Sequence, residues 1–142
     1  MKVAIGADHG GYDMKEILKT HIAILGHEVD DVGCFSSESV DYPDFARRVS
    51  ELVQNGSCDA GILICGTGIG MSMAANRYKG IRAALCHDEY TARMSREHND
   101  ANILCIGARV IGNGVAEDMV SVWLATQFSG GRHQRRIDLF DI

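Results

Sequence analysis

The chain has 142 residues, which is enough for one domain to bury a hydrophobic core without disulfide bonds. Its hydrophobic content of 46% and its single proline are typical of a globular protein and exclude a disordered one. The formal net charge of -5 argues against nucleic acid as the main partner, although local basic clusters could still bind the phosphate of a small molecule.

The cysteines and the N-terminal residues indicate where the protein works. The number of cysteines is odd and no two form a C-x-x-C pair, which favours reduced thiols over a disulfide framework. The N-terminal residues turn polar at Asp8, too early for a signal peptide, and no apolar run reaches membrane-spanning length. We therefore expect a cytoplasmic protein with no membrane partner. The cysteines are Cys34, Cys58, Cys65, Cys86 and Cys105.

Strand and helix patterns alternate along the chain. Short apolar runs predict strands, and apolar residues spaced three or four apart predict helices. Gly26 stops the first helix, Pro43 is tolerated in the first turn of the second, and Asp88 is a candidate N-cap for the fourth. A short helix is expected within residues 130–142, after a Gly-Gly break. In chain order the other predicted elements are strand 3–7, helix 14–25, strand 28–32, helix 41–53, strand 60–64, helix 71–77, strand 82–86, helix 88–98, strand 103–106 and helix 115–127.

Five strands that alternate with helices predict an α/β fold, a doubly wound five-stranded parallel sheet with right-handed crossovers. No repeat, linker or low-complexity segment interrupts the pattern, so residues 1–142 are expected to form a single domain with a C-terminal helix. In such sheets ligands bind beyond the carboxyl ends of the strands. Three polar loops are expected there, at residues 8–9, 65–70 and 107–109.

The loop after the third predicted strand carries the strongest chemical signal. Residues 62–78 read ILICGTGIGMSMAANRY, an apolar run that ends in Cys65 and a glycine-rich turn. Met71 stands where a dinucleotide fingerprint needs glycine and where a Cys-x5-Arg phosphatase needs arginine, and the lysine of an NTPase phosphate loop is missing. A thiol followed by free backbone amides suits reactions that build negative charge on a substrate oxygen. The alternative is a tight turn in which Cys65 is one more small buried residue.

Six motifs follow one another over essentially the whole chain. They are ADHGGYDMK at 7–15, SVDYP at 39–43, ICGTGIGMSMAANR at 64–77, REHNDANIL at 96–104, GARVIG at 107–112 and GGRHQRR at 130–136. Together they resemble ribose-5-phosphate isomerase type B, within the wider family that includes galactose-6-phosphate and allose-6-phosphate isomerases. The resemblance implies a Rossmann-like sheet and a homodimer or dimer of dimers. It also implies interconversion of ribose 5-phosphate and ribulose 5-phosphate through an enediolate, as in the pentose phosphate pathway.

The resemblance assigns the proton transfers to the glycine loop. Cys65 is implied as the base that moves the C2 proton, and the loop amides favour its thiolate. Thr67, whose hydroxyl can donate and accept, is implied as the relay between O1 and O2. Some branches of the family carry glutamate directly after the loop; this chain has Met71 there, which leaves Cys65 as the candidate base. The residues implied to hold the enediolate oxygens are Gly66, Gly68, Ile69 and Gly70.

Further residues are implied to handle the sugar. His98 resembles the family residue that opens the sugar ring, helped by Asn99, because imidazole can gain or lose a proton near neutral pH. Without the resemblance, His98 would be a helix C-terminal histidine that interacts with the dipole. Asp8 is implied to bind a sugar hydroxyl or orient a catalytic group, and its alternative role as an N-cap is compatible with this. Tyr42, beside a capping Asp41, is expected to border the sugar.

Arginines provide the expected phosphate site. Arg132 and Arg136 are one helical turn apart, so both guanidinium groups can face one phosphate. The resemblance adds His9 and Arg109 to this group, whereas an exposed basic helix face is otherwise often only solvated. Because the helix of His98 and the terminal helix are expected at the sheet edge, we expect a neighbouring subunit to supply part of each site.

Two other functions stay open from the sequence. One is isomerisation of a six-carbon sugar phosphate, and the other is a non-catalytic phosphate-binding module of flavodoxin-like architecture. No histidine outside the motifs shows metal-ligand spacing to a cysteine or carboxylate, and amides can stabilise an enediolate, so no metal or other cofactor is expected. Met71, Met73 and Met94 are expected in the core. Trp123 is expected in the core or at an interface.

Overall fold

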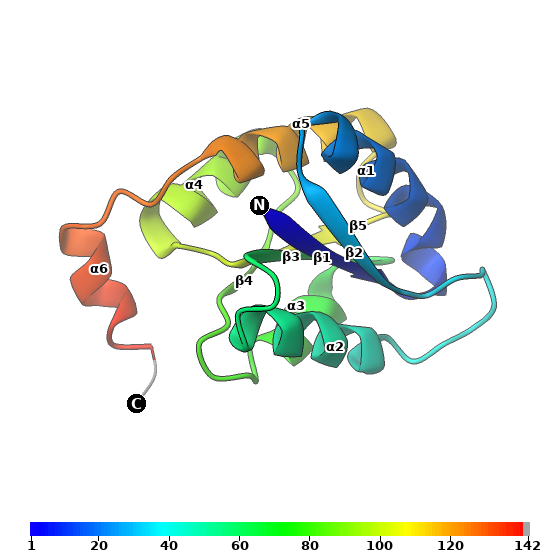
Figure 1. Cartoon of the computed structure of the whole chain (residues 1–142), viewed down its shortest axis with the longest axis horizontal. Helices are drawn as coiled ribbons and strands as arrows, with labels where there is room; N and C mark the ends of the chain where they lie inside the picture. Colours follow the sequence, from blue (N-terminus) through cyan, green and yellow to red (C-terminus); the bar gives the residue numbers. More distant parts are fainter. Residues whose placement is uncertain (141–142) are drawn as a thin grey trace.

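The computed structural model describes residues 1–140 and shows a five-stranded parallel sheet in the order β2-β1-β3-β5-β4 (Figure 1). The predicted α/β fold with a C-terminal helix is confirmed. The strands are β1 (Lys2–Ala7), β2 (Glu28–Gly33), β3 (Ala60–Cys65), β4 (Ala83–Leu85) and β5 (Ile103–Gly107). The helices are the 3-10 turn η1 (His9–Gly11), α1 (Tyr12–Ile24), α2 (Tyr42–Gln54), α3 (Ile69–Ala75), α4 (Glu89–Asn99), α5 (Asn113–Ala125) and α6 (Arg132–Ile137).

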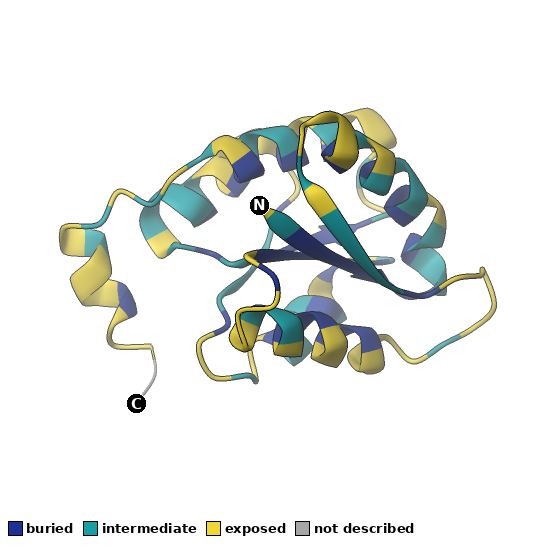
Figure 2. Cartoon of the chain, viewed as in Figure 1, coloured by how far each residue is buried: buried dark blue, intermediate teal, exposed yellow. Residues whose placement is uncertain are grey.

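Helices cover both faces of the sheet. α1, α4 and α5 lie on one face, and α2 and α3 lie on the other (Figure 1). The central strands β1, β3 and β5 are buried along almost their whole length, whereas the helices are buried only where they meet the sheet (Figure 2). This explains why the central strands are continuous apolar runs in the sequence, since both of their faces are covered.

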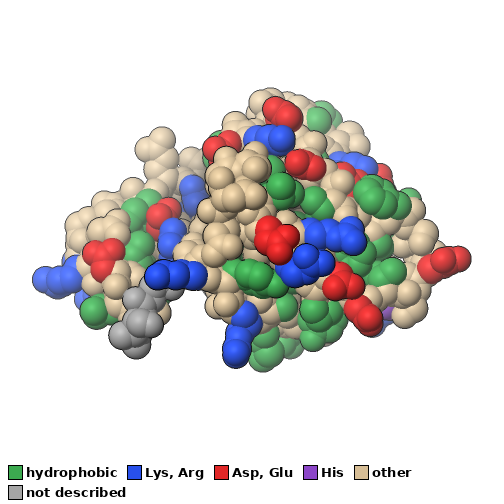
Figure 3. Space-filling model, turned by 60° about the horizontal axis from the view of Figure 1, so that its bottom comes forward, with side chains coloured by type: hydrophobic (Ala, Val, Ile, Leu, Met, Phe, Trp, Pro, Cys, Tyr) green, Lys and Arg blue, Asp and Glu red, His purple; other side chains and the backbone are tan. Residues whose placement is uncertain are grey.

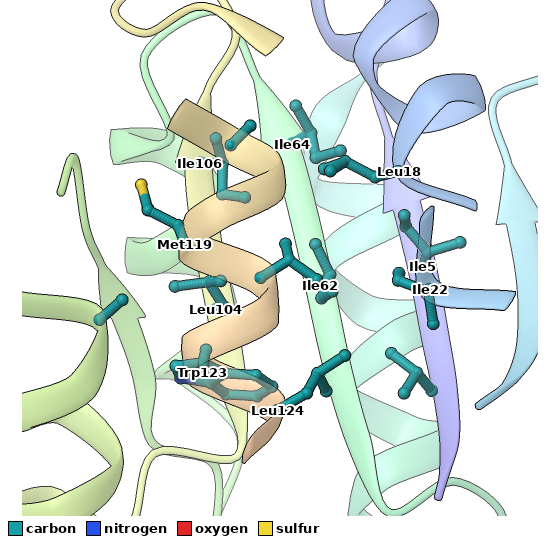
Figure 4. Packing of buried hydrophobic residues seen from close by; sticks show 14 of the residues in the cluster. Ile5, Leu18, Ile22, Ile62, Ile64, Leu104, Ile106, Met119, Trp123 and Leu124 are labelled. Atoms are coloured by element: carbon teal, nitrogen blue, oxygen red, sulfur yellow. The ribbon is translucent and has the colours of Figure 1, made fainter. Parts of the chain in front are cut away.

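Alternate residues of each central strand enter opposite cores. Ile62 and Ile64 of β3 point towards α1 and α5, where they pack with Leu18 and Trp123 (Figure 4). Leu63, between them, points into the other core with α2 and α3. The indole Nε1 of Trp123 donates to Ser95 Oγ at 3.2 Å, so Trp123 is a satisfied core residue that ties α5 to α4.

Local chemistry explains where the helices begin and end. Gly26, with φ +89°, follows α1, and Pro43 stands in the first turn of α2. The Asp88 side chain accepts from Thr91 N at 2.7 Å and caps α4, as predicted. α3 runs from 69 to 75 rather than 71 to 77. It ends early because the side chain of Asn76 makes two hydrogen bonds to the backbone of Ala83 and so ties the chain to β4.

The strand order determines where a ligand can bind. The chain goes from β1 to β2 on one side and then crosses to β3 on the other, so the loops after β1 and β3 diverge at their carboxyl ends. At the other end of the order, the three-residue strand β4 forms an edge. α6 contacts α4 and extends beyond this edge, away from the body of the molecule (Figure 1).

Candidate active site

A pocket of about 450 Å³ lies at the carboxyl ends of β1 and β3. The loops after β1, β3 and β5 contribute to it, as the sequence predicted, and α2 and α3 complete its wall. It therefore occupies the divergence between β1 and β3, where this type of sheet binds ligands. Its lining residues are Asp8, Tyr42, Cys65, Gly66, Thr67, Ile69, Gly70, Met73 and Arg109.

Cys65 is the last residue of β3 and is 5% exposed. Its Sγ accepts a hydrogen bond from Gly68 N at 3.1 Å, inside the turn that follows the strand. An N–H that points at sulfur stabilises negative charge there. Cys65 is therefore a packed residue, and it also lines the pocket.

The turn around Cys65 depends on glycine. Gly68 has φ +77°, and a Cβ on it would lie 2.5 Å from the Leu85 side chain, so no other residue fits without movement. Within the described residues, the backbone N–H groups of Gly66, Thr67 and Gly70 donate to no protein acceptor. These amides remain free to bind oxygen atoms of a ligand.

Thr67 is exposed at the pocket, and its Oγ1 accepts from Ile69 N at 3.2 Å. This hydrogen bond uses one lone pair and leaves the hydroxyl hydrogen and a second lone pair. The side chain can therefore donate to one substrate oxygen and accept from another, as proton relay requires.

Tyr42 forms part of the wall of the pocket. It is the first residue of α2, and its ring lies so close to Gly70 that a Cβ there would be 2.6 Å from the ring atom Cζ. Gly70 therefore makes room for the tyrosine as well as offering its amide. Asp41 takes the N-cap position of α2, as predicted, but its side chain makes no capping hydrogen bond.

Asp8 lines the pocket and also caps a turn, so the two roles expected for it coexist. Its side chain is 8% exposed, and Oδ1 accepts from Gly10 N at 2.9 Å and from Gly11 N at 3.2 Å. Among residues 1–140, Oδ2 has no hydrogen-bond donor. One oxygen is thus held by the backbone while the other is left for a ligand.

His9 follows Asp8 in the η1 turn and is held by the segment before α2. Its Nδ1 accepts from Val40 N at 3.2 Å. A backbone N–H can only donate, so Nδ1 carries no hydrogen in this arrangement and the neutral ring has its hydrogen on Nε2. His9 can therefore donate to a ligand through Nε2.

Arg109 supplies positive charge to the pocket. Its backbone N donates to Gly66 O at 3.0 Å, and its guanidinium lies over Gly66 and Gly10, within 3.2 Å and 3.6 Å of where their Cβ atoms would be. No carboxylate in the described part of the chain pairs with it. A positioned guanidinium with no internal counter-ion is suited to bind an anionic group such as phosphate.

His98 and Asn99 do not reach this pocket in the same chain. α4 runs antiparallel to the strands and ends where the sheet begins, since Asn99 O accepts from Arg82 Nε just before β4. Cys65 lies at the other end of the sheet. The sequence predicted His98 at the helix end and a site shared with a neighbouring subunit, and the direction of α4 keeps His98 away from the Cys65 loop of its own chain.

His98 instead stacks on His133 of α6. The ring centroids are 4.3 Å apart and the rings are 11° from parallel. Burial, followed by the nearby His98 and Arg132, lowers the pKa of His133. Arg132 and Arg136 are exposed on the same short helix, one turn apart as predicted, and also lie outside the Cys65 pocket of their own chain.

One prediction for the methionines is wrong. Met71 is fully buried, as expected, and Met94 is half-buried, but Met73 is 67% exposed and lines the pocket. Residues two apart on a helix point in nearly opposite directions, so Met71 and Met73 cannot both face the core. This spacing is the signal that could have identified Met73 as a pocket residue.

Other features of the surface bear on ligands and partners. Lys and Arg side chains are interspersed with Asp and Glu on the face drawn in Figure 3. Among residues 1–140, no three metal-binding side chains gather, and no helix is long and apolar enough to cross a membrane. All five cysteines are free thiols and buried.

Known proteins are similar to this chain in sequence and in fold. The family described as Ribose/Galactose Isomerase matches residues 3–140. Ribose-5-phosphate isomerase B of Escherichia coli is 48% identical over 137 residues, 96% of this chain and 92% of that protein. Solved structures of ribose-5-phosphate isomerase B from Clostridium thermocellum (55% identity, TM-score 0.97, 98% of this chain and 94% of that one) and Thermotoga maritima (51%, 0.97, 99% and 97%) superpose closely. The chain therefore belongs to the ribose/galactose isomerase family.

Proposed function

We propose that this chain is an aldose–ketose isomerase that interconverts ribose 5-phosphate and ribulose 5-phosphate. The observation that carries the proposal is the Cys65 thiol, which receives a hydrogen bond from Gly68 N beside free loop amides in a pocket that also holds Arg109. Thiol, oxyanion donors and a cation together match an enediolate reaction on a phosphorylated substrate. The relatives named ribose-5-phosphate isomerase B support the choice of the five-carbon sugar.

The reaction is a proton transfer between neighbouring carbons. The Cys65 thiolate takes the C2 proton of the open-chain aldose, and the electron pair moves through the C1–C2 bond onto the carbonyl oxygen O1. The amides of Gly66 and Gly70 stabilise the enediolate. Thr67 transfers the hydroxyl proton from O2 to O1, and Cys65 returns its proton to C1. Atoms and electrons balance without a metal or redox cofactor.

We further propose that a second copy of the chain completes each site. His98 and Asn99 lie at the end of α4 where the strands begin, and Arg132 and Arg136 lie on α6 beyond the β4 edge, so none of the four lines the Cys65 pocket of its own chain. Beyond the end of α6, the apolar side chains of Leu139 and Phe140 are exposed. An exposed apolar arm whose arginines pair with no carboxylate among residues 1–140 is suited to insert against a neighbouring copy.

In the assembled site, the residues from the second copy would act together with those of the pocket. His98, with Asn99, would protonate the ring oxygen of the cyclic sugar and open it. Arg132 and Arg136 would meet Arg109 and His9 around the phosphate, where forked guanidinium groups bind several oxygens at once. Asp8 Oδ2 would accept from a sugar hydroxyl, and Tyr42 would border the sugar.

We also place the protein in the cytoplasm, supported by its buried free thiols.

The test is proton NMR of ribose 5-phosphate with the purified protein in deuterated buffer. We expect ribulose 5-phosphate to form with deuterium at C1, because the proton taken up by Cys65 exchanges with solvent before it is returned, and we expect the reverse reaction to bring deuterium to C2 of ribose 5-phosphate. Cys65→Ser should lose turnover by about a hundredfold or more, because serine is a far weaker base at neutral pH, while inorganic phosphate still binds. No conversion by folded wild-type protein would overturn the proposal, and allose and galactose 6-phosphates would then decide between a six-carbon isomerase and a binding module.

A further inference from the structure

Lys15 is a fully buried lysine outside the pocket, with 0% of its side chain exposed. Its Nζ lies 2.7 Å from Asp31 Oδ2 and 2.8 Å from Glu16 Oε1. Lysine is almost never fully buried unless it is paired, and here two carboxylates pair with it. None of the proposed reaction steps uses this group.

Lys19 joins the same two carboxylates. Its Nζ lies 2.7 Å from Asp31 Oδ2 and 3.0 Å from Glu16 Oε2. Burial acts to raise the pKa of Asp31, but hydrogen bonds from Lys15 and Lys19 outweigh it and hold that pKa below its usual range. The cluster therefore contains two lysines and two carboxylates, and removing one lysine leaves neither carboxylate without a cation.

The two lysines differ in what else they touch. Lys15 Nζ lies 5.2 Å from the centroid of the Phe35 ring and 5.5 Å from that of the Tyr12 ring, whereas Lys19 is 30% exposed and contacts no ring in the described structure. Phe35 is 68% exposed, so little else packs on it. A cation over an aromatic face attracts the ring, and more strongly when the cation is shielded from water.

Phe35 belongs to the segment of residues 34–41, which connects β2 to the pocket. Residues 35–39 are all exposed, and the segment is attached at few points. Cys34 N donates to Ala7 O at 2.8 Å at one end, and Val40 N donates to His9 Nδ1 at 3.2 Å at the other. Directly after the segment comes Tyr42, whose ring covers Gly70.

We propose that Lys15 is a positioning residue for the pocket, acting through Phe35. The ammonium, held by Asp31 and Glu16, attracts the Phe35 ring and so fixes the segment 34–41. This segment in turn orients His9 and sets the entry of Tyr42 into the wall. The kinetic part of this inference rests on the proposed isomerase function.

The experiment compares Lys15→Met with Lys19→Met. Each variant removes one cation from the same carboxylates, but only the first removes the cation beneath Phe35. We expect Lys15→Met to raise KM for ribose 5-phosphate about fivefold or more, the factor that ~1 kcal/mol of cation–π attraction represents. Its kcat should change by less than about twofold, since the Cys65 loop lies outside the cluster. Lys19→Met should leave both constants near the wild-type values.

Phe35→Ala provides a second variant that changes an exposed residue and so does not endanger folding. It should raise KM by a similar factor, and adding Lys15→Met to it should raise KM little further, because residues that act as a unit give non-additive effects. Cleavage after the exposed Glu38 by a glutamate-specific protease should be faster in both variants than in wild type or Lys19→Met.

Two results would overturn the proposal. One is that Lys15→Met and Lys19→Met change KM and the cleavage rate after Glu38 equally. The other is that the rise in KM of the double variant equals the product of the rises caused by Lys15→Met and Phe35→Ala alone. Should Lys15→Met fail to fold, an unchanged KM and cleavage rate in Phe35→Ala would overturn it as well. If wild type turned over no sugar phosphate, the proposed function would fail, and the cleavage rate after Glu38 would still decide the role of Lys15.

Discussion

The contact between Gly70 and Tyr42 shows how one missing side chain shapes the pocket. Gly70→Ala would place a Cβ 2.6 Å from Tyr42 Cζ, and the tyrosine is exposed enough to swing away. We expect KM for ribose 5-phosphate to rise several-fold, because Tyr42 lines the pocket in which we propose that the sugar binds. Stability should hold or increase by up to ~1 kcal/mol, since alanine favours a helix. Steady-state kinetics and urea unfolding measure both effects.

Gly114→Ala is the matched control for this substitution. Gly114 occupies the second position of α5 as Gly70 does of α3, but nothing lies within 4 Å of its added Cβ. It should gain stability to a similar extent and leave KM unchanged. An unchanged KM in Gly70→Ala would show that Tyr42 does not define the substrate wall.

Residue types and short spacings predicted much of the candidate site. Cys65, Thr67 and Asp8 lie in one pocket because each stands at or just beyond the carboxyl end of a strand, and these ends lie at the same edge of the sheet. Arg109 also lines it, after β5. The roles of these residues in catalysis and binding stay predictions. The support that we propose for Lys15 had no sequence signal, because Asp31 and Phe35 come from β2 and from an irregular segment.

Between elements, the ion cluster that joins α1 to β2 makes stability depend on pH. The folded pKa of Asp31 lies below its unfolded value, so its contribution is complete above the unfolded pKa of ~4 and is lost as the pH falls through the folded value. Asp31→Asn should therefore lower the free energy of unfolding clearly at pH 7 and by less at pH 3. Urea unfolding at the two pH values measures this.

Asp118→Asn is a suitable control for the pH effect, because Asp118 is exposed on α5 and pairs with no cation among the described residues. Asp118→Asn should change the free energy of unfolding by the same small amount at both pH values. If Asp31→Asn lowered the free energy of unfolding as much at pH 3 as at pH 7, the ionised carboxylate of Asp31 would not be what joins α1 to β2.

At the scale of the whole molecule, the separation of the Cys65 pocket from α6 predicts complementation between chains. Cys65→Ser and the double variant Arg132→Ala/Arg136→Ala should each be nearly inactive alone. When they are unfolded together and refolded, mixed dimers regain one intact site, and activity should reach about a quarter of wild type. An isomerase assay after refolding measures it. Failure to regain activity, or full activity in a wild-type monomer, would contradict shared sites.

The sequence by itself determined which segments are strands and helices and that the strands run parallel. Alternating apolar runs and helical periodicity depend only on neighbours along the chain, so the five parallel strands, their helices and the Cys65 loop could be predicted from local pattern. The same holds for the one-turn spacing of Arg132 and Arg136. Helix ends were less certain, as α3 shows, because a side chain that pairs with β4 decides where that helix stops.

Only the tertiary structure decided which of these parts meet. The insertion of β5 between β3 and β4, the position of Tyr42 over Gly70 and the exposure of Met73 in the pocket depend on how crossovers bring distant segments together. The direction of α4 likewise sends His98 to the end of the sheet opposite Cys65. Local pattern carries no information on these contacts, since their free energy comes from surfaces that become neighbours only when the whole sheet has formed.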